Sequence, residues 1–140
     1  MKKLNTLFAI LLALVFFISY GVLPANAEGA APKGNKLLKA DLLQVVDLGP
    51  EFDGMQGRQL RLRMLTIEPG GYIGMHSHKD RPAVVYFIQG TDTVTFEDGT
   101  SKVFNAGDTT SANKDTKHWH RNDGKEPVVL VTTDVFNSAK

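Results

Sequence analysis

The chain has 140 residues, no cysteine, and 16 basic against 15 acidic side chains. A chain of this length has room for one domain, and without cysteine no disulfide can stabilise it. The nearly balanced charge argues against a nucleic-acid partner, because nucleic acids are bound through a basic face.

The first 27 residues have the pattern of a cleaved, helical signal peptide. Lys2 and Lys3 precede an uncharged, strongly apolar stretch that ends in Ala25-Asn26-Ala27. A basic start, an apolar core and a small-x-small site are typical of export followed by cleavage. The alternative is an uncleaved membrane anchor, but the apolar core is slightly shorter than the ~20 residues that span a bilayer. We therefore expect cleavage after Ala27, a secreted or periplasmic protein, and no stable membrane anchor afterwards.

Cleavage would leave residues 28–140 with a net charge of −1, because two lysines and no acidic residue are removed. Residues 28–36 are small, polar and aperiodic, which predicts a flexible lead-in. Residues 37–140 are then expected to form the folded domain.

The expected domain consists of short segments rich in Val, Ile, Thr and Phe, separated by turns such as EPGG, EDGT and NAGD. These segments predict strands at 42–48, 58–67, 83–89, 93–96, 102–104 and 127–136. No long segment repeats with the helical period of 3.6 residues. Many short strands between glycine-containing turns predict an all-β sandwich or barrel.

Two of these strands have informative patterns. In 58–67 apolar residues alternate with arginines, so the two sets should face opposite sides of the sheet. The apolar set is Leu60, Leu62 and Met64, and the other set is Arg61 and Arg63. Segment 83–89 is apolar on both faces, which predicts a strand covered on both sides in the core.

The four histidines form two His-x-His pairs, His76 with His78 and His118 with His120. In a strand, residues i and i+2 point to the same face about 7 Å apart, so each pair sends both rings one way. Unpaired imidazoles are costly to bury, and a divalent metal would remove that cost while linking distant strands. Surface histidines in a polar loop are the alternative, but the pairing of every histidine favours a metal site.

The spacing around the first pair resembles the first motif of the cupin superfamily. That motif reads Gly, five residues, His-x-His, three or four residues, Glu, six residues, Gly. In this chain its positions are occupied by Gly70, His76, His78, Ala83 and Gly90. The match is specific apart from the glutamate, which is replaced by alanine.

The second cupin motif is matched more loosely. It reads Gly, five residues, Pro-x-Gly, two residues, His, three residues, Asn, and it corresponds here to Gly99, Asn105, Gly107, His118 and Asn122, with a longer gap before the histidine. The resemblance covers about residues 37–136. It implies a double-stranded β-helix, or jelly-roll barrel, of six to eight strands. It also implies His76, His78 and His118 as metal ligands, and a homodimer paired through outer strands.

Two departures from the motifs bear on the chemistry. With Ala83 in place of glutamate, the metal lacks its usual carboxylate ligand, which favours Fe, Zn, Ni or Cu over Mn. His120 should lie on the face of His118, and three roles remain open for it. It could be a fourth ligand, a general base beside the metal, or a donor to a substrate, and we favour the first two.

Several neighbouring residues are expected to have structural roles. Val85 and Phe87 should line the barrel near the metal. Trp119 should pack outside the barrel, where its partner could be another subunit. Asn122 should stabilise the turn that follows it, since Asn side chains bond readily to their own backbone. Asp80 is expected to be a turn residue in a local ion pair rather than a ligand.

Three functions remain compatible with this pattern. The first is a metal-dependent enzyme of dioxygenase, isomerase or lyase type acting on a small organic substrate. The second is a non-catalytic protein that binds a metal or a small molecule, with a structural metal site. The third is a sugar-binding or structural barrel with an empty site.

Overall fold

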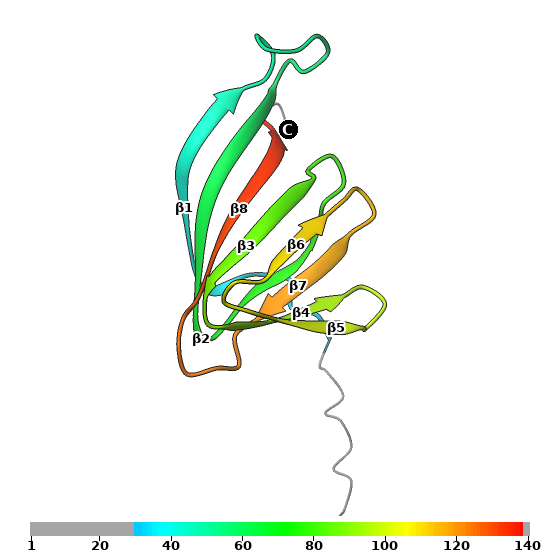
Figure 1. Ribbon diagram of the computed structural model, residues 1–140. Helices are drawn as coiled ribbons and strands as arrows, with labels where there is room; N and C mark the ends of the chain where they lie inside the picture. The colour runs from blue at the N-terminus through cyan, green and yellow to red at the C-terminus, as the bar shows by residue number, and fades with distance from the viewer. Residues whose placement is uncertain (1–29, 139–140) are drawn as a thin grey trace, which may run out of the picture.

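The computed structural model describes residues 30–138, which form eight strands and no helix (Figure 1). The strands are β1 (Lys36–Asp47), β2 (Arg58–Ser77), β3 (Ala83–Gln89), β4 (Thr91–Phe96), β5 (Ser101–Asn105), β6 (Thr109–Ala112), β7 (Lys117–Arg121) and β8 (Val128–Asn137). Within this part of the chain there is no helix with the length and apolarity needed to cross a membrane. The predicted signal peptide and its cleavage site lie outside the described residues.

The eight strands form one curved antiparallel sheet. Its order is β5-β4-β7-β2-β8-β3-β6. β1 lies outside this order and pairs with the first part of β2, on the side opposite β8. The long strand β2 joins the two halves of the barrel, because its first part pairs with β1 and β8 and its last part with β7. In Figure 1 the strands curl around a common interior, and β1, β2 and β8 extend beyond the others. The predicted all-β barrel is confirmed.

The main differences from the predicted strands concern β2 and β6. β2 does not end at the EPGG segment but continues through it to Ser77. Gly70 adopts a φ of +74°, which favours glycine, and its N–H donates to the carbonyl of Asn122 at 2.9 Å. The strand therefore changes direction without losing its partners. β6 has four small or polar residues with no apolar alternation, so the sequence contains no signal for it.

The main apolar core is formed by side chains of β2, β3 and β8. It consists of Leu65 and Ile67 from β2, Phe87 from β3, and Val128 and Leu130 from β8. The rings of Phe87 and Phe104 stack with centroids 5.0 Å apart. Each such side chain contributes about 1.5–3 kcal/mol on full burial, so this cluster anchors the strands that carry the site.

The alternation predicted for β2 is present, and the arginine face is the one that points inward. Arg61 and Arg63 are 15% and 21% exposed, whereas Leu60 is 38% exposed. The same inward face continues along β2 with Leu65 and Ile67, which belong to the core. A pair of arginines therefore lies on the inner face of the barrel, next to the apolar core along β2.

The prediction that β3 is covered on both faces is wrong. Ala83 and Phe87 are buried, but Val84 and Tyr86 on the opposite face are 59% and 51% exposed. Both faces are apolar in sequence, yet the described chain supplies cover for only one of them. Apolar composition alone does not distinguish a covered face from an uncovered one.

Residues preceding β1 lie against the last part of β2. The N–H of Met75 donates to the carbonyl of Pro32 at 2.8 Å, and the N–H of Gly74 donates to Oδ1 of Asn35 at 3.0 Å. A Cβ on Gly74 would lie 2.4 Å from the carbonyl oxygen of Gly34, so only glycine permits this approach. The polar composition of this segment gave no indication of such pairing.

Candidate metal centre

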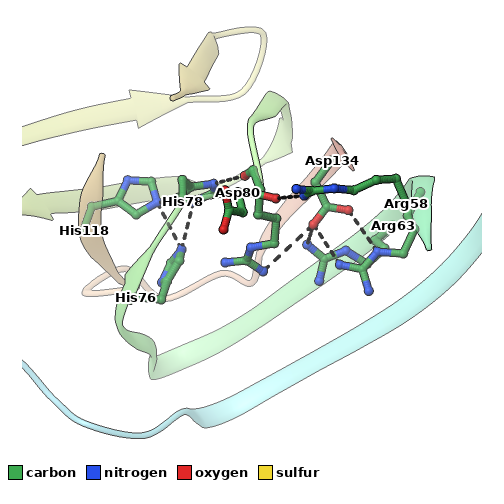
Figure 2. Close-up of polar contacts among 9 residues, drawn as sticks. Arg58, Arg63, His76, His78, Asp80, His118 and Asp134 are labelled. Carbon is green, nitrogen blue, oxygen red and sulfur yellow. Dashed lines mark hydrogen bonds and ion pairs between the residues drawn. The ribbon is translucent and has the colours of Figure 1, made fainter. Parts of the chain in front are cut away.

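The histidines meet where β2 and β7 are paired. His76 on β2 is in register with His118 on β7, and His78 follows directly after the end of β2. The Nε2 atoms of His76 and His78 are 3.2 Å apart, those of His78 and His118 are 3.0 Å apart, and those of His76 and His118 are 3.1 Å apart. Figure 2 shows the three rings pointing at one another. The structure therefore brings together all three ligands that the resemblance implies.

His120 belongs to a second, overlapping group. Ring nitrogens of His76, His118 and His120 lie within 4.8 Å of one another, and together they could hold a metal ion. The ring of His120 is parallel to that of His76, with centroids 5.8 Å apart. The group with His78 is the tighter of the two. Three nitrogens each ~2.1 Å from one ion, at right angles, would be ~3 Å apart, which agrees with the separations in that group.

Hydrogen bonds to the opposite ring nitrogens determine the tautomers. Nδ1 of His76 lies 2.9 Å from the carbonyl oxygen of Gly74, and Nδ1 of His78 lies 2.9 Å from that of Arg81. Because a carbonyl oxygen only accepts, each Nδ1 must carry the proton and each neutral ring has a bare Nε2 lone pair. Backbone or carboxylate acceptors behind the ring are the usual support of metal-bound histidine.

Burial keeps these rings neutral. It lowers the pKa of His76 to about 4, against the raising effect of its hydrogen bond to Gly74. It lowers the pKa of His118 to about 2, with the positive charge of neighbouring histidines as the next cause. The pKa of His78 is also lowered by burial. Near neutral pH the Nε2 lone pairs are therefore free to bind a cation.

Asp92 on β4 is a functional candidate that the sequence analysis missed. Its side chain is fully buried, and its Oδ2 accepts a hydrogen bond from Nδ1 of His120 at 2.6 Å. This contact leaves the lone pair of the neutral His120 ring on Nε2. Asp92 follows the QG turn, so it resembled a turn residue. Its two-residue spacing from the buried Val94 was the available signal, since both share the inward face.

A cavity of about 420 Å³ adjoins the histidines. Its wall combines apolar side chains (Leu65, Ile73, Val85 and Leu130) with polar ones (Arg63, Arg81, Thr110 and Thr132). Val85 lines it as expected, whereas Phe87 lies deeper, in the core. A concave, partly apolar space with a few polar groups is the usual form of a small-molecule site.

The remaining expectations have mixed outcomes. Trp119 is 6% exposed within this chain, so it is not left open for another subunit, and the guanidinium of Arg121 lies 5.3 Å from its ring centroid. Asn122 stabilises the turn as expected, because its Oδ1 accepts the N–H of Gly124 at 2.9 Å. Asp80 is in a turn with a φ of +59° and is not among the groups that could hold a metal.

Solved structures with the same fold come from distant proteins. An uncharacterised conserved protein with a double-stranded β-helix domain from Klebsiella pneumoniae has a TM-score of 0.60 at 18% identity, over 79% of this chain and 86% of that one. A predicted oxalate decarboxylase from Thermotoga maritima has a TM-score of 0.59 at 16% identity, over 75% and 86%. KdgF from a Halomonas species has a TM-score of 0.55 at 16% identity, over 70% and 78%. Identities this low indicate a shared fold and nothing about substrate.

Family membership rests on the sequence. A search of curated protein sequences finds no match. Residues 63–135, slightly more than half of the chain, match the model of the Cupin domain. This region contains both histidine pairs and Asp92. The chain belongs to the cupin family.

Proposed function

We propose that this cupin binds one divalent transition metal through His76, His78 and His118, and uses it on a small organic molecule in the adjoining cavity. The main support is the contact between Nε2 of His76 and Nε2 of His78, which are 3.2 Å apart. In both neutral rings Nδ1 carries the proton, so neither Nε2 atom has a hydrogen with which to form a hydrogen bond to the other. Two lone pairs at this distance repel each other unless a cation lies between them.

The ligand set limits the identity of the metal. Three neutral imidazoles with no carboxylate favour Fe, Zn, Ni or Cu over Mn, which prefers oxygen ligands. Ala83 occupies the position where the family motif has glutamate. A bound divalent ion would polarise a substrate oxygen or lower the pKa of a coordinated water.

His120 is proposed as the residue that moves a proton, or as a fourth ligand. Asp92 holds the Nδ1 proton of His120, so Nε2 is the atom that can accept a proton from a molecule in the cavity. The same lone pair could bind the metal if the rings shift slightly, since its group is the looser one. In both cases the hydrogen bond to Asp92 orients the ring.

A non-catalytic metal site is the second candidate. If all four imidazoles bind the ion, little room for a substrate is left on the metal, which is the mark of a structural site. The cavity of about 420 Å³ beside the rings favours the open, substrate-binding form. Exchangeable water on the metal, measured by proton relaxation of a paramagnetic ion in the site, would distinguish the two forms.

Metal analysis tests the proposal directly. Protein purified without added metal should contain close to one transition-metal ion per chain, and the double variant His76→Ala/His118→Ala should contain almost none. Ser77→Ala is the matched control, because Ser77 lies between two ligands and its exposed side chain accepts a hydrogen bond from the N–H of Lys79. A wild-type protein with no more metal than the double variant would refute both metal functions.

Export is proposed on the sequence pattern alone. If the protein is expressed with its leader in a host that has a general secretion pathway, the chain recovered outside the cytoplasm should begin at Glu28 by intact mass. Replacing the small residue at the site, as in Ala27→Tyr, should block processing. Recovery of the unprocessed 140-residue chain in membranes would instead indicate an anchor.

A further inference from the structure

Three arginine side chains surround one buried carboxylate beside the candidate metal centre. Arg61 and Arg63 from β2 and Arg81 from the turn before β3 all approach Asp134 of β8. Asp134 is 1% exposed, and the arginines are 15–26% exposed. These four side chains carry three positive charges and one negative charge in a largely buried place. Burying uncompensated charge is costly, and a further anion would remove that cost.

The three arginines are not equivalent. Arg61 donates Nε and Nη2 to the two oxygens of Asp134 at 3.0 and 2.8 Å. Arg63 donates only Nη2, at 2.8 Å, and its Nε is buried without a hydrogen-bond partner. Nη1 of Arg81 lies 3.9 Å from Asp134, beyond hydrogen-bond reach. Arg61 is thus the structural partner of Asp134, whereas Arg63 and Arg81 keep binding capacity.

Arg63 and Arg81 line the same cavity as the histidines, and Arg61 does not. In Figure 2 His76, His78 and His118 lie on one side of the view, and Arg63 and Asp134 lie on the other. The backbone carbonyl of Arg81 accepts the Nδ1 hydrogen bond of His78, which ties the arginine to a proposed metal ligand. A molecule in the cavity could contact both groups.

The replacement of glutamate by Ala83 leaves this part of the barrel without a ligand carboxylate. Ala83 is in register with Ala112 on β6 and with Asp134 on β8, so a small side chain lies beside the carboxylate that the arginines approach. The histidine ligands carry no negative charge. A bound divalent ion would therefore add to the positive charge of the arginines.

We propose that Arg63 and Arg81 bind the carboxylate of a small organic anion whose other end reaches the histidine site. The inference rests on the proposed function for that second end. A planar guanidinium matches a carboxylate with two parallel hydrogen bonds, and Arg63 lines the cavity while using only Nη2 toward Asp134. Thr132, in register with Arg63 and lining the cavity, supplies a hydroxyl beside it. The substrate class is thus a small carboxylate.

Calorimetric titration of the purified, metal-free protein with malonate tests the arginine subsite apart from the metal. Malonate should bind, and malonamide, which has a similar shape and no charge, should not. Arg63→Gln should weaken malonate binding at least about tenfold, because charge-assisted hydrogen bonds are lost. Lys39→Gln is the control: it also removes one positive charge, but Lys39 is exposed, pairs with Asp41 and lies outside the cavity, so affinity should be unchanged.

A second variant covers the case in which Arg63→Gln unfolds the protein. Ala83→Glu leaves every arginine in place and puts a carboxylate beside them, so it should also weaken malonate binding. Equal affinities in Arg63→Gln and Lys39→Gln, or no preference for malonate over malonamide, would overturn the inference. A protein that takes up no metal yet binds malonate through Arg63 would refute the proposed function and uphold the anion subsite.

Discussion

Asn122 has no exposed surface, and hydrogen bonds satisfy both ends of its side-chain amide. Its Nδ2 donates to the carbonyls of Ile67 and Glu126, each at 2.8 Å, and its Oδ1 accepts the N–H of Gly124. The side chain therefore joins the turn after β7 to the middle of β2. A turn role could be predicted from its residue type, but the bond to Ile67 depends on a neighbour 55 positions away.

We expect Asn122→Ala to lower the free energy of unfolding by about 2–3 kcal/mol, because buried partners are left unsatisfied. Denaturant titration of the metal-free protein measures this without a contribution from metal binding. Asn105→Ala is the control: Asn105 is exposed and accepts a hydrogen bond from Thr91, so it should cost less than about 1 kcal/mol. Similar losses in both variants would contradict the structural role of Asn122.

The buried histidines predict an acid-sensitive metal-free protein. In the unfolded chain histidines take up a proton near pH 6.5. In the folded chain burial lowers the pKa of His76 to about 4 and that of His118 to about 2, so these rings stay neutral to lower pH. A lowered folded pKa means that stability is fully present above pH 6.5 and is lost as pH falls. At pH 5 the loss from His118 alone is about 2 kcal/mol.

Melting temperatures of chelator-treated protein at pH 7.5, 6 and 5 measure this dependence. The melting temperature should fall steadily over the series, by at least about 5 °C in total. In His118→Gln the fall should be smaller, because one of the buried rings with a lowered pKa is gone. A melting temperature that stays constant or rises toward pH 5 would show that the rings are not held neutral.

At the scale of elements, the segment before β1 depends on one glycine. Gly74→Ala would place a methyl group against the backbone of Gly34, whereas a Cβ built on Gly34 itself meets nothing within 4 Å. We expect Gly74→Ala to release residues 30–35 and to speed tryptic cleavage after Lys33 severalfold, because released backbone is accessible to the protease. Gly34→Ala should be cleaved like the wild type. Equal cleavage of the two variants would contradict the observed docking.

The elements also show where periodicity is sufficient and where it is not. The positions of β3 and β8 followed closely from apolar runs between turns. The continuation of β2 through Gly70 did not, because a Gly-Gly segment usually interrupts a strand, and here hydrogen bonds to the chain around Asn122 preserve it. β6 is stabilised by pairing with β3 rather than by its own composition.

At the scale of the whole molecule, the open face of β3 predicts self-association. Val84 and Tyr86 are more than half exposed, and they border a surface hollow that also includes Val131. Contiguous exposed apolar residues commonly mark an interface. We therefore keep the homodimer implied by the cupin resemblance as a prediction, with this face as the contact.

Light scattering after size-exclusion chromatography should give twice the mass of the chain. Val84→Lys/Tyr86→Lys should produce monomers, because two charges would be buried at the contact. Val103→Lys is the control, since Val103 is 57% exposed on β5, at the other end of the strand order. A monomeric wild type at micromolar concentrations would contradict the prediction.

By itself the sequence determined the all-β class, most strand positions and the histidines of the candidate site. These features depend on local patterns: the period of two in a strand and the fixed spacing of paired histidines. The resemblance to the cupin motifs also predicted the barrel. Its two motifs lie on strands that pair in the structure, with His76 in register with His118.

Only the tertiary structure decided which face of each strand points inward. Alternation places Arg61 and Arg63 on the face opposite their leucine neighbours. Which of the two faces points into the barrel depends on how the sheet curls. The pairing of Asp134 with the arginines and of Asp92 with His120 joins residues 28 to 73 positions apart. Such contacts form because barrel closure brings these strands together and buried charges require partners, and neither condition can be read from a local stretch of chain.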